Sequence, residues 1–181
     1  MYKGLEPQSQ TVITFNGPFD YDDQVQRSAI RALAIAVENQ LLEEVREELG
    51  GTYSIGVGPG FSWRPEERYQ MTISFGSDPE RADELVDRIF EGLQSFQEFG
   101  PTEEQVADAR ETLLRQFETD FQENRTGLSQ LVNDYQRGTD PGASVKTFES
   151  SVEALTVGLI QEAARRYFDT ENYVRVTLMP E

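Results

Sequence analysis

The stretch REELGGTYSIGVG, residues 46–58, carries the main prediction about how this chain folds. It ends a long amphipathic helical pattern, turns on Gly50 and Gly51, and opens a segment that alternates apolar and small residues as a strand does. Arg46 and Tyr53 stand on either side of this turn. The whole chain contains no histidine and no cysteine. The usual zinc ligands are therefore missing, and so are the usual partners of a nucleophilic triad.

Outward from this stretch, hydrophobic periodicity and turn residues predict the remaining elements. Strands are expected at 9–16, 52–58, 67–76 and 172–179, and helices at 22–49, from Asp78 to Gly100, from Thr102 onward, at 126–137 and from Thr156 to Phe168. The last strand is expected to turn Val174, Val176 and Leu178 inward. Without its extra helices, the order becomes β-α-β-β-α-β, the split β-α-β pattern. We therefore expect a single α+β domain over residues 1–181: a two-layer α/β sandwich with helices on one face of a mainly antiparallel sheet.

Helix ends are marked by local signals. Thr102 and Gln105 form a capping box, and Thr156 is placed to cap the last helix. The aspartates at 20, 22 and 23 are expected to cap the long helix at its positive end rather than to bind calcium, because no Asp-x-Asp-x-Asp-Gly loop is present. The many neighbouring glutamates are interpreted as a solvated helix face rather than a catalytic pair.

The segment GVGPG, residues 56–60, places glycine at every second position of a predicted strand. Pro59 and the hairpin context argue against a phosphate-binding loop, which needs a following helix N-terminus. The spacing makes one strand face bare, so that something can approach it closely. A tightly packed helix is the preferred interpretation, and a ligand is the alternative.

The formal charge of −17 arises from 33 acidic and 16 basic residues. Such a charge repels phosphates and argues against a nucleic-acid partner. Only Lys3 and Lys146 are lysines, and all other basic residues are arginines. An acidic surface with almost no lysine is favoured in salt-rich surroundings, so a halophilic source is one interpretation. No segment is long and apolar enough to predict a membrane span.

On spacing alone, Arg46 reads as a cation in a last helical turn and Tyr53 as an ordinary strand aromatic. Residues 41–57, LLEEVREELGGTYSIGV, however, resemble the insulinase/pitrilysin family of zinc peptidases, the inverzincins. That family carries an Arg-Glu-x-x-Gly-x-x-Tyr-like segment in its C-terminal half, which Arg46, Glu47, Gly50 and Tyr53 match. The resemblance extends over essentially the whole chain, through GLEPQSQTVITFNGPFDYD (4–22), ISFGSDPERADELVDRIFEGL (73–93) and FESSVEALTVGLIQEAARRYFDTENYVRVTLMP (148–180).

The resemblance implies the C-terminal, metal-free domain of a larger bacterial zinc endopeptidase. The opening Met1-Tyr2-Lys3-Gly4 runs directly into a strand-like segment, which favours an excised fragment. In that family the zinc is held by His-x-x-Glu-His in the N-terminal half. Arg46 would then bind the peptide substrate, and Tyr53 would bind it and assist catalysis as an oxyanion donor.

The implied partners are a peptide substrate and the zinc-binding half of the same protein or a partner subunit. The chain alone is expected to hold no cofactor and to cleave nothing. Two alternatives stay open: a non-catalytic scaffold or partner subunit of the same family, and a generic ligand-binding α+β domain. The sequence leaves the compartment undecided between periplasm and cytoplasm.

Overall fold

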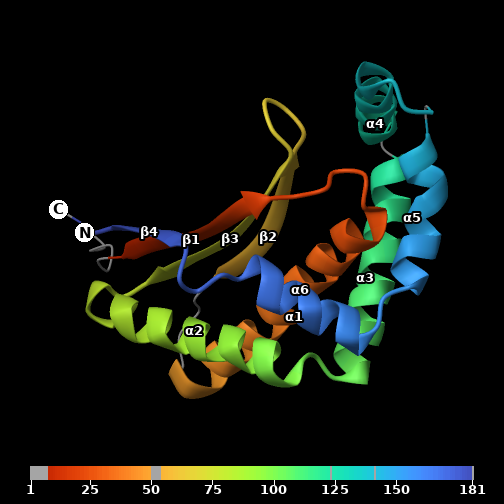
Figure 1. Cartoon of the computed structure of the whole chain (residues 1–181). Coiled ribbons are helices and arrows are strands. Elements are labelled where there is room, and N and C mark those ends of the chain that lie inside the picture. Colours follow the sequence, from red (N-terminus) through yellow and green to blue (C-terminus); the bar gives the residue numbers. More distant parts are fainter. Residues whose placement is uncertain (1–7, 50–53, 123, 141, 181) are drawn as a thin grey trace, which may run out of the picture.

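A four-stranded antiparallel sheet forms one layer of the molecule, and helices form the other (Figure 1). The structure is a computed structural model that describes residues 8–49, 54–122, 124–140 and 142–180, with side chains except at 45–49, 121–122 and 124–126. The strands are β1 (Ser9–Pro18), β2 (Ile55–Ser62), β3 (Arg68–Ser77) and β4 (Tyr173–Leu178). They lie in the order β2-β3-β1-β4, with Ile13 of β1 opposite Ile73 of β3 and Val12 of β1 opposite Val176 of β4.

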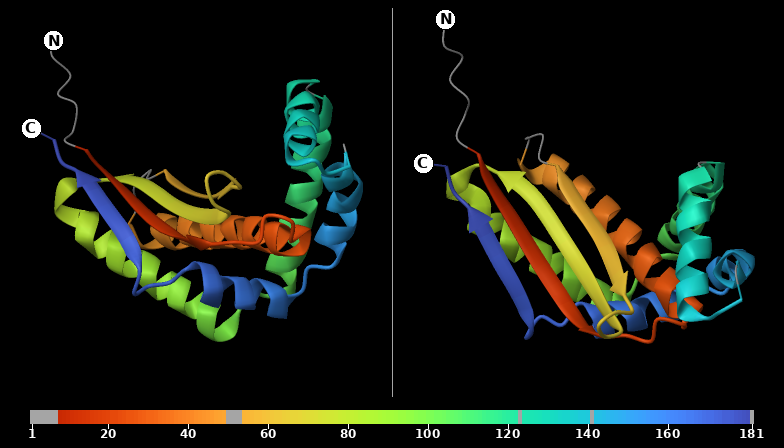
Figure 2. Two further views of the ribbon diagram at one scale, coloured as in Figure 1. Left: turned by 45° about the horizontal axis from the view of Figure 1, so that its top comes forward. Right: turned by 90° about the horizontal axis from the view of Figure 1, so that it is seen from above.

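The helices are α1 (Gln24–Leu49), α2 (Ala82–Phe99), α3 (Glu103–Gln122), α4 (Asn124–Arg137), α5 (Ala143–Glu153) and α6 (Val157–Tyr167), with a 3-10 turn at Pro79–Arg81 before α2. Helices α1, α2 and α6 cover one face of the sheet, and α3, α4 and α5 gather beyond one end of it (Figures 1 and 2). The predicted α+β sandwich with a β-α-β-β-α-β core is therefore confirmed.

Helix α1 is the centre of the helical layer. It contacts β2, α6, α3, α5 and α2. Its alanines at 29, 32, 34 and 36 point in several directions, yet each is at most 2% exposed. Small side chains on several sides allow neighbours to approach α1 from all of these directions. The sheet side of the same core contains Ile13, Phe15, Met71, Ile73 and Phe75.

The predicted caps are present. The Thr102 N–H donates to Gln105 Oε1 at 2.8 Å, and the Gln105 N–H donates to Thr102 Oγ1 at 3.1 Å. Asp23 accepts the Gln26 N–H at 2.9 Å at the start of α1, and Thr156 accepts the Leu159 N–H at 3.2 Å at the start of α6.

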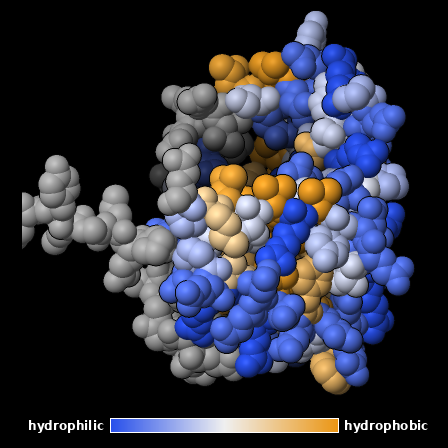
Figure 3. All heavy atoms as spheres, turned by 90° about the vertical axis from the view of Figure 1, so that its left-hand side faces the viewer, coloured by the Kyte–Doolittle hydropathy of each residue, from blue (hydrophilic) through white to orange (hydrophobic). Residues whose placement is uncertain are grey.

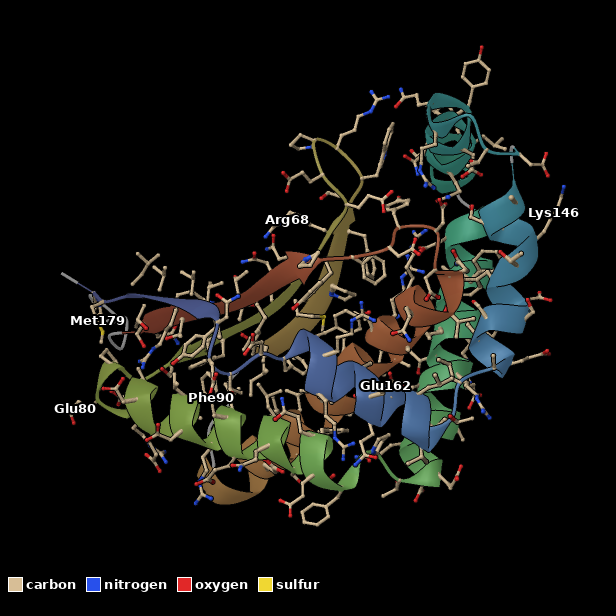
Figure 4. All side chains as sticks on the ribbon, in the orientation of Figure 1. Arg68, Glu80, Phe90, Lys146, Glu162 and Met179 are labelled. Carbon is tan, nitrogen blue, oxygen red and sulfur yellow. The ribbon has the colours of Figure 1, made fainter. Side chains whose placement is uncertain are left out.

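The predicted orientation of β4 is wrong. Val174, Val176 and Leu178 are 57%, 53% and 67% exposed, because they lie on the face of the sheet that the helices leave uncovered. The opposite side of β4 faces the helices, where the Tyr173 ring packs 4.9 Å from the Phe90 ring of α2 (Figure 4). Helix α5 was also not predicted. Its N-cap is Gly142 with φ of 84°, without a side-chain cap, so the sequence carries no start signal for it.

Candidate functional site

The predicted site residues lie at the junction of α1 and β2. Arg46 belongs to the last turn of α1, but its side chain is outside the described residues, and so is the whole of Tyr53. The pairing of these two side chains therefore stays a prediction. On either side of the junction, α1 ends at Leu49 and β2 begins at Ile55.

We call the uncovered side of the sheet the open face. Its side chains come from alternate positions of the four strands. These positions are Gly56, Gly58 and Gly60 of β2, which carry no side chain, Gln70, Thr72 and Ser74 of β3, Val12, Thr14 and Asn16 of β1, and Val174, Val176 and Leu178 of β4. Figure 3, viewed from the left-hand side of Figure 1, shows hydrophobic side chains across the middle of the molecule and again near its top, with a recess between them.

The glycines of β2 make a bare strip on the open face. A Cβ atom at Gly58 would meet nothing within 4 Å, and one at Gly60 would meet only Gln70 Cβ at 3.9 Å. The predicted close-packed helix is therefore wrong: in the described part of the chain, the helices cover the other face of the sheet. What remains is the alternative, a strand face free for something to approach, and the strip begins directly after the predicted Arg46–Tyr53 turn.

Arg68 closes the far end of this strip (Figure 4). Its Nη2 donates to Asn16 Oδ1 at 3.0 Å, and its Nη1 donates to Glu66 at 3.3 Å. A shallow recess of about 330 Å³ lies here, lined by Gly60, Ser62 and Gln70 beside Arg68. The strip therefore runs from the predicted motif to a surface guanidinium.

The outer edge of β2 is closed to strand pairing. Val57 donates its backbone N–H to Glu38 of α1 at 2.8 Å. Two residues further along the same edge, Pro59 has no N–H to donate. Proteins prevent an edge strand from pairing with another chain in such ways: a side chain takes up a backbone hydrogen bond of the edge, or a proline removes a backbone donor. A ligand at this site would therefore lie over the open face rather than extend the sheet.

Helix α4 and the β2–β3 loop form a raised wall at one end of the open face (Figure 1). Trp63 Nε1 donates to Asn133 Oδ1 at 2.9 Å, which ties the loop to α4. Arg137 donates to Asp22 at 2.7 Å and stacks over the Tyr21 ring at 4.4 Å, which ties α4 to the start of α1. The other side of α4 exposes an apolar stripe, formed by Leu128, Leu131, Val132 and Tyr135.

The side chains that the structure describes do not suit a metal site. The chain has no histidine or cysteine. Within the described ranges, no three acidic side chains lie close enough together to hold a metal ion. What the described surface offers is a bare strip with a guanidinium at its end, and no described residue completes a catalytic centre.

Residues 2–113 match the model of a protein family described as the peptidase M16 inactive domain. The chain belongs to this family. Its resemblance to the insulinase/pitrilysin zinc peptidases is thereby confirmed. The match includes both Arg46 and Tyr53, although it does not itself assign them a role.

The M16 domain is also similar to individual proteins. It is 29% identical over 160 residues to a "Zinc protease PQQL-like" from Arabidopsis thaliana, covering 80% of this chain and 17% of that protein. Among solved structures, the periplasmic protease PqqL from Escherichia coli superposes with a TM-score of 0.77 at 20% identity, over 97% of this chain and 19% of that one. A peptidase M16 inactive domain from Pseudomonas fluorescens gives 0.75 at 18% identity, over 94% and 40% of the two chains. This chain therefore spans about a fifth of the length of the first two relatives.

Two arginines of α1, the buried Arg27 and the half-buried Arg31, were not predicted as candidates. They stand one helical turn apart in QVQRSAIRALAIAV (24–37), an otherwise mainly apolar run. Charged side chains inside such a run were the signal that could have identified them. No described helix is both long enough and apolar enough to cross a membrane.

Proposed function

We propose that this M16 domain is the substrate-binding, chamber-closing C-terminal domain of a zinc-dependent endopeptidase. The observation that supports this is the family match over residues 2–113, which includes the Arg46–Tyr53 segment. The zinc would be held by another part of the parent protein, because the side chains of this chain do not suit it. The relatives' greater length leaves room for that part.

In this proposal, Tyr53 and Arg46 act on the substrate backbone. The carbonyl oxygen of a peptide bond gains negative charge when the bond is attacked, and the Tyr53 hydroxyl donates a hydrogen bond to that oxygen. Arg46 holds a neighbouring carbonyl and thus positions the chain. Both groups reach the reacting bond only when the domains close, so closure completes the site.

The open face is the surface over which the substrate approaches. Its glycine strip begins beside the motif, offers space at Gly58, and ends at Arg68. The closed edge of β2 keeps the substrate from joining the sheet as a further strand. A peptide is therefore held through its contacts with the face and with the two motif side chains.

The exposed apolar stripes serve the rest of the parent protein. Val174, Val176 and Leu178 on β4 form one stripe, and α4 carries the other. Contiguous apolar side chains on a surface mark interaction sites. The proposed occupant is the zinc-bearing half of the same protein or its partner subunit.

The test is made in the full-length protein with a fluorogenic peptide. Tyr53→Phe removes only the hydroxyl, so kcat is expected to fall by about 10²–10³ with the fold intact. Arg46→Gln is expected to raise KM more than it lowers kcat. Tyr173→Phe is the matched control, because Tyr173 lies on the helix side of β4, outside the motif and both apolar stripes, and should leave both constants unchanged. A Tyr53→Phe enzyme with unchanged kcat would remove Tyr53 from the mechanism. Absence of cleavage by the wild-type parent would favour the scaffold alternative.

A further inference from the structure

A second cavity lies at the opposite end of α1 from the Arg46–Tyr53 motif. It has a volume of about 210 Å³, is partly open to solvent, and lies between α1, α3, α4 and α5. A cavity of about 150 Å³ is large enough for a benzene molecule, so a ring-sized group fits here. Lys146 of α5 points away from it, toward solvent (Figure 4).

Arg27 and Arg31 of α1 line this cavity. Arg27 is only 7% exposed, and its Nε has no hydrogen-bond partner. Its guanidinium is held over the Tyr21 ring at 4.5 Å, and one Nη donates a long hydrogen bond of 3.4 Å to Gln24. Buried guanidinium donors are normally paired, so Arg27, with its Nε unpaired, has fewer acceptors than its charge favours.

Arg31, one helical turn further along α1, is half-buried. Its guanidinium lies 5.6 Å from the Phe61 ring centroid, and within the described ranges it makes no hydrogen bond or ion pair. Burial, together with repulsion by Arg27, lowers the pKa of Arg31 to about 10, so it is still charged at neutral pH. An anion between the two arginines would relieve both effects.

The charges of Asp134 and Asp22 act on Arg27 from a distance, but neither carboxylate forms an ion pair with Arg27 or Arg31. Asp134 is buried, but it accepts the Gly142 N–H at 3.0 Å and the Ser144 hydroxyl at 3.3 Å. Asp22 is engaged by Arg137. Asp120 also lines the cavity, but it is exposed and forms no ion pair or hydrogen bond with either arginine.

The rest of the lining is divided by character. Leu113, Val145 and the stacked rings of Phe117 and Phe148, 4.4 Å apart, form an apolar wall. Gln24, Gln116, Gln130 and Ser144 supply polar groups. The cavity therefore has two neighbouring arginines at one end and an aromatic wall at the other side.

We propose that this cavity binds a carboxylate attached to an apolar group, as presented by an acidic peptide. The guanidinium groups of Arg27 and Arg31 hold the carboxylate, and the apolar part lies against Phe117 and Phe148. Arginine suits this role because its planar fork matches a carboxylate. The inference does not depend on the proposed peptidase function, since it concerns residues far along α1 from Arg46.

Calorimetric titration of this chain tests the proposal with four probes. Two are an acetylated peptide ending in phenylalanine with a free carboxylate, and the same peptide as its C-terminal amide. The other two are acetyl-Glu-Phe-amide and acetyl-Gln-Phe-amide, which place the carboxylate on a side chain. We expect at least one carboxylate probe to bind tenfold or more tightly than its neutral counterpart, and the better one identifies the source of the carboxylate. Equal binding within both pairs, or no binding at millimolar concentrations, would overturn the proposal.

Two variants locate the binding in the cavity. Arg31→Met removes the charge but keeps an apolar stem, and it is expected to weaken binding at least tenfold. Arg115→Met is the matched control, because Arg115 is exposed on α3 and outside the cavity lining.

Gly127→Leu fills the cavity from α4 without changing either arginine. A Cβ there meets nothing within 4 Å, and leucine favours a helix over glycine, so this variant is expected to fold. It too should abolish binding. Unchanged binding in a folded Arg31→Met or Gly127→Leu protein would place the probe elsewhere and refute the site.

Discussion

The Glu38 carboxylate of α1 accepts the backbone N–H of Val57 at 2.8 Å, at the outer edge of β2. One helical side chain thus occupies a hydrogen bond that a further strand would need. Pro59 lacks the next donor on the same edge. The sheet is therefore protected along the edge that adjoins the predicted motif.

Replacing Glu38 should allow the edge of β2 to pair with a strand of another molecule. Glu38→Ala leaves the half-buried Val57 N–H without its acceptor, at a cost of about 1 kcal/mol in the free energy of unfolding. We also expect self-association at high protein concentration. Urea unfolding and sedimentation velocity measure the two effects. Glu43→Ala, an exposed position on the same helix, is the control. A Glu38→Ala protein as stable and as monomeric as this control would contradict the protective role.

Gly17 and Gly58 are predicted to respond oppositely to alanine. At Gly17 a Cβ would lie 2.8 Å from Cε1 of the buried Tyr69 ring, which is itself packed 4.7 Å from Tyr167. Gly17→Ala is therefore expected to destabilise the fold by about 1–3 kcal/mol. At Gly58 the added methyl group meets nothing, so Gly58→Ala should be neutral or stabilising by up to about 1 kcal/mol. Thermal unfolding of both variants provides the measurement, and similar shifts would show that the two sites are equally packed.

Salt is expected to raise the stability of this chain. The net charge of −17 makes the folded surface repel itself, and raising the salt from 0.1 M to 1 M shortens the Debye length from about 10 Å to about 3 Å. The free energy of unfolding should therefore increase with KCl. A variant carrying Gln at the exposed positions 149, 153 and 162 should depend on salt less steeply. Stability that stays constant from low to molar salt would dismiss the interpretation of a halophilic source.

Locally encoded features were predicted well. The capping box of Thr102 and Gln105 and the cap at Thr156 depend on residues three positions apart, so the sequence alone contains their geometry. The strand–helix order followed from periodicity for the same reason. Helix α5 was missed because its start is a glycine with left-handed backbone, which provides no capping side chain.

The orientation of β4 shows where periodicity stops being informative. Alternation predicts two faces but not which face is covered, and a register shift by one residue exchanges them. Here Tyr173 packs against Phe15 and Phe90, and Arg175 pairs with Asp83, so the aromatic and charged side chains turn toward the helices. The valines are left outside. That outcome depends on α2, which is about ninety residues away in the chain.

One part of the candidate functional residues could be predicted from the sequence, and the other part could not. The Arg46–Tyr53 motif came from resemblance to a family, and its side-chain geometry is still a prediction. The cavity of Arg27 and Arg31 came only from the structure, because α3, α4 and α5 must assemble around α1 before it exists.

The bare strip of β2 also bears on selectivity. A row of glycines has no side chains with which to distinguish one residue from another, and the strand that carries it is already paired with β3. Such a surface can discriminate between peptides only by the width of the chain that lies over it. If peptides cross the open face, preference for particular residues must be set at the two ends of the strip, and the stretch between them should tolerate a wide variety of sequences.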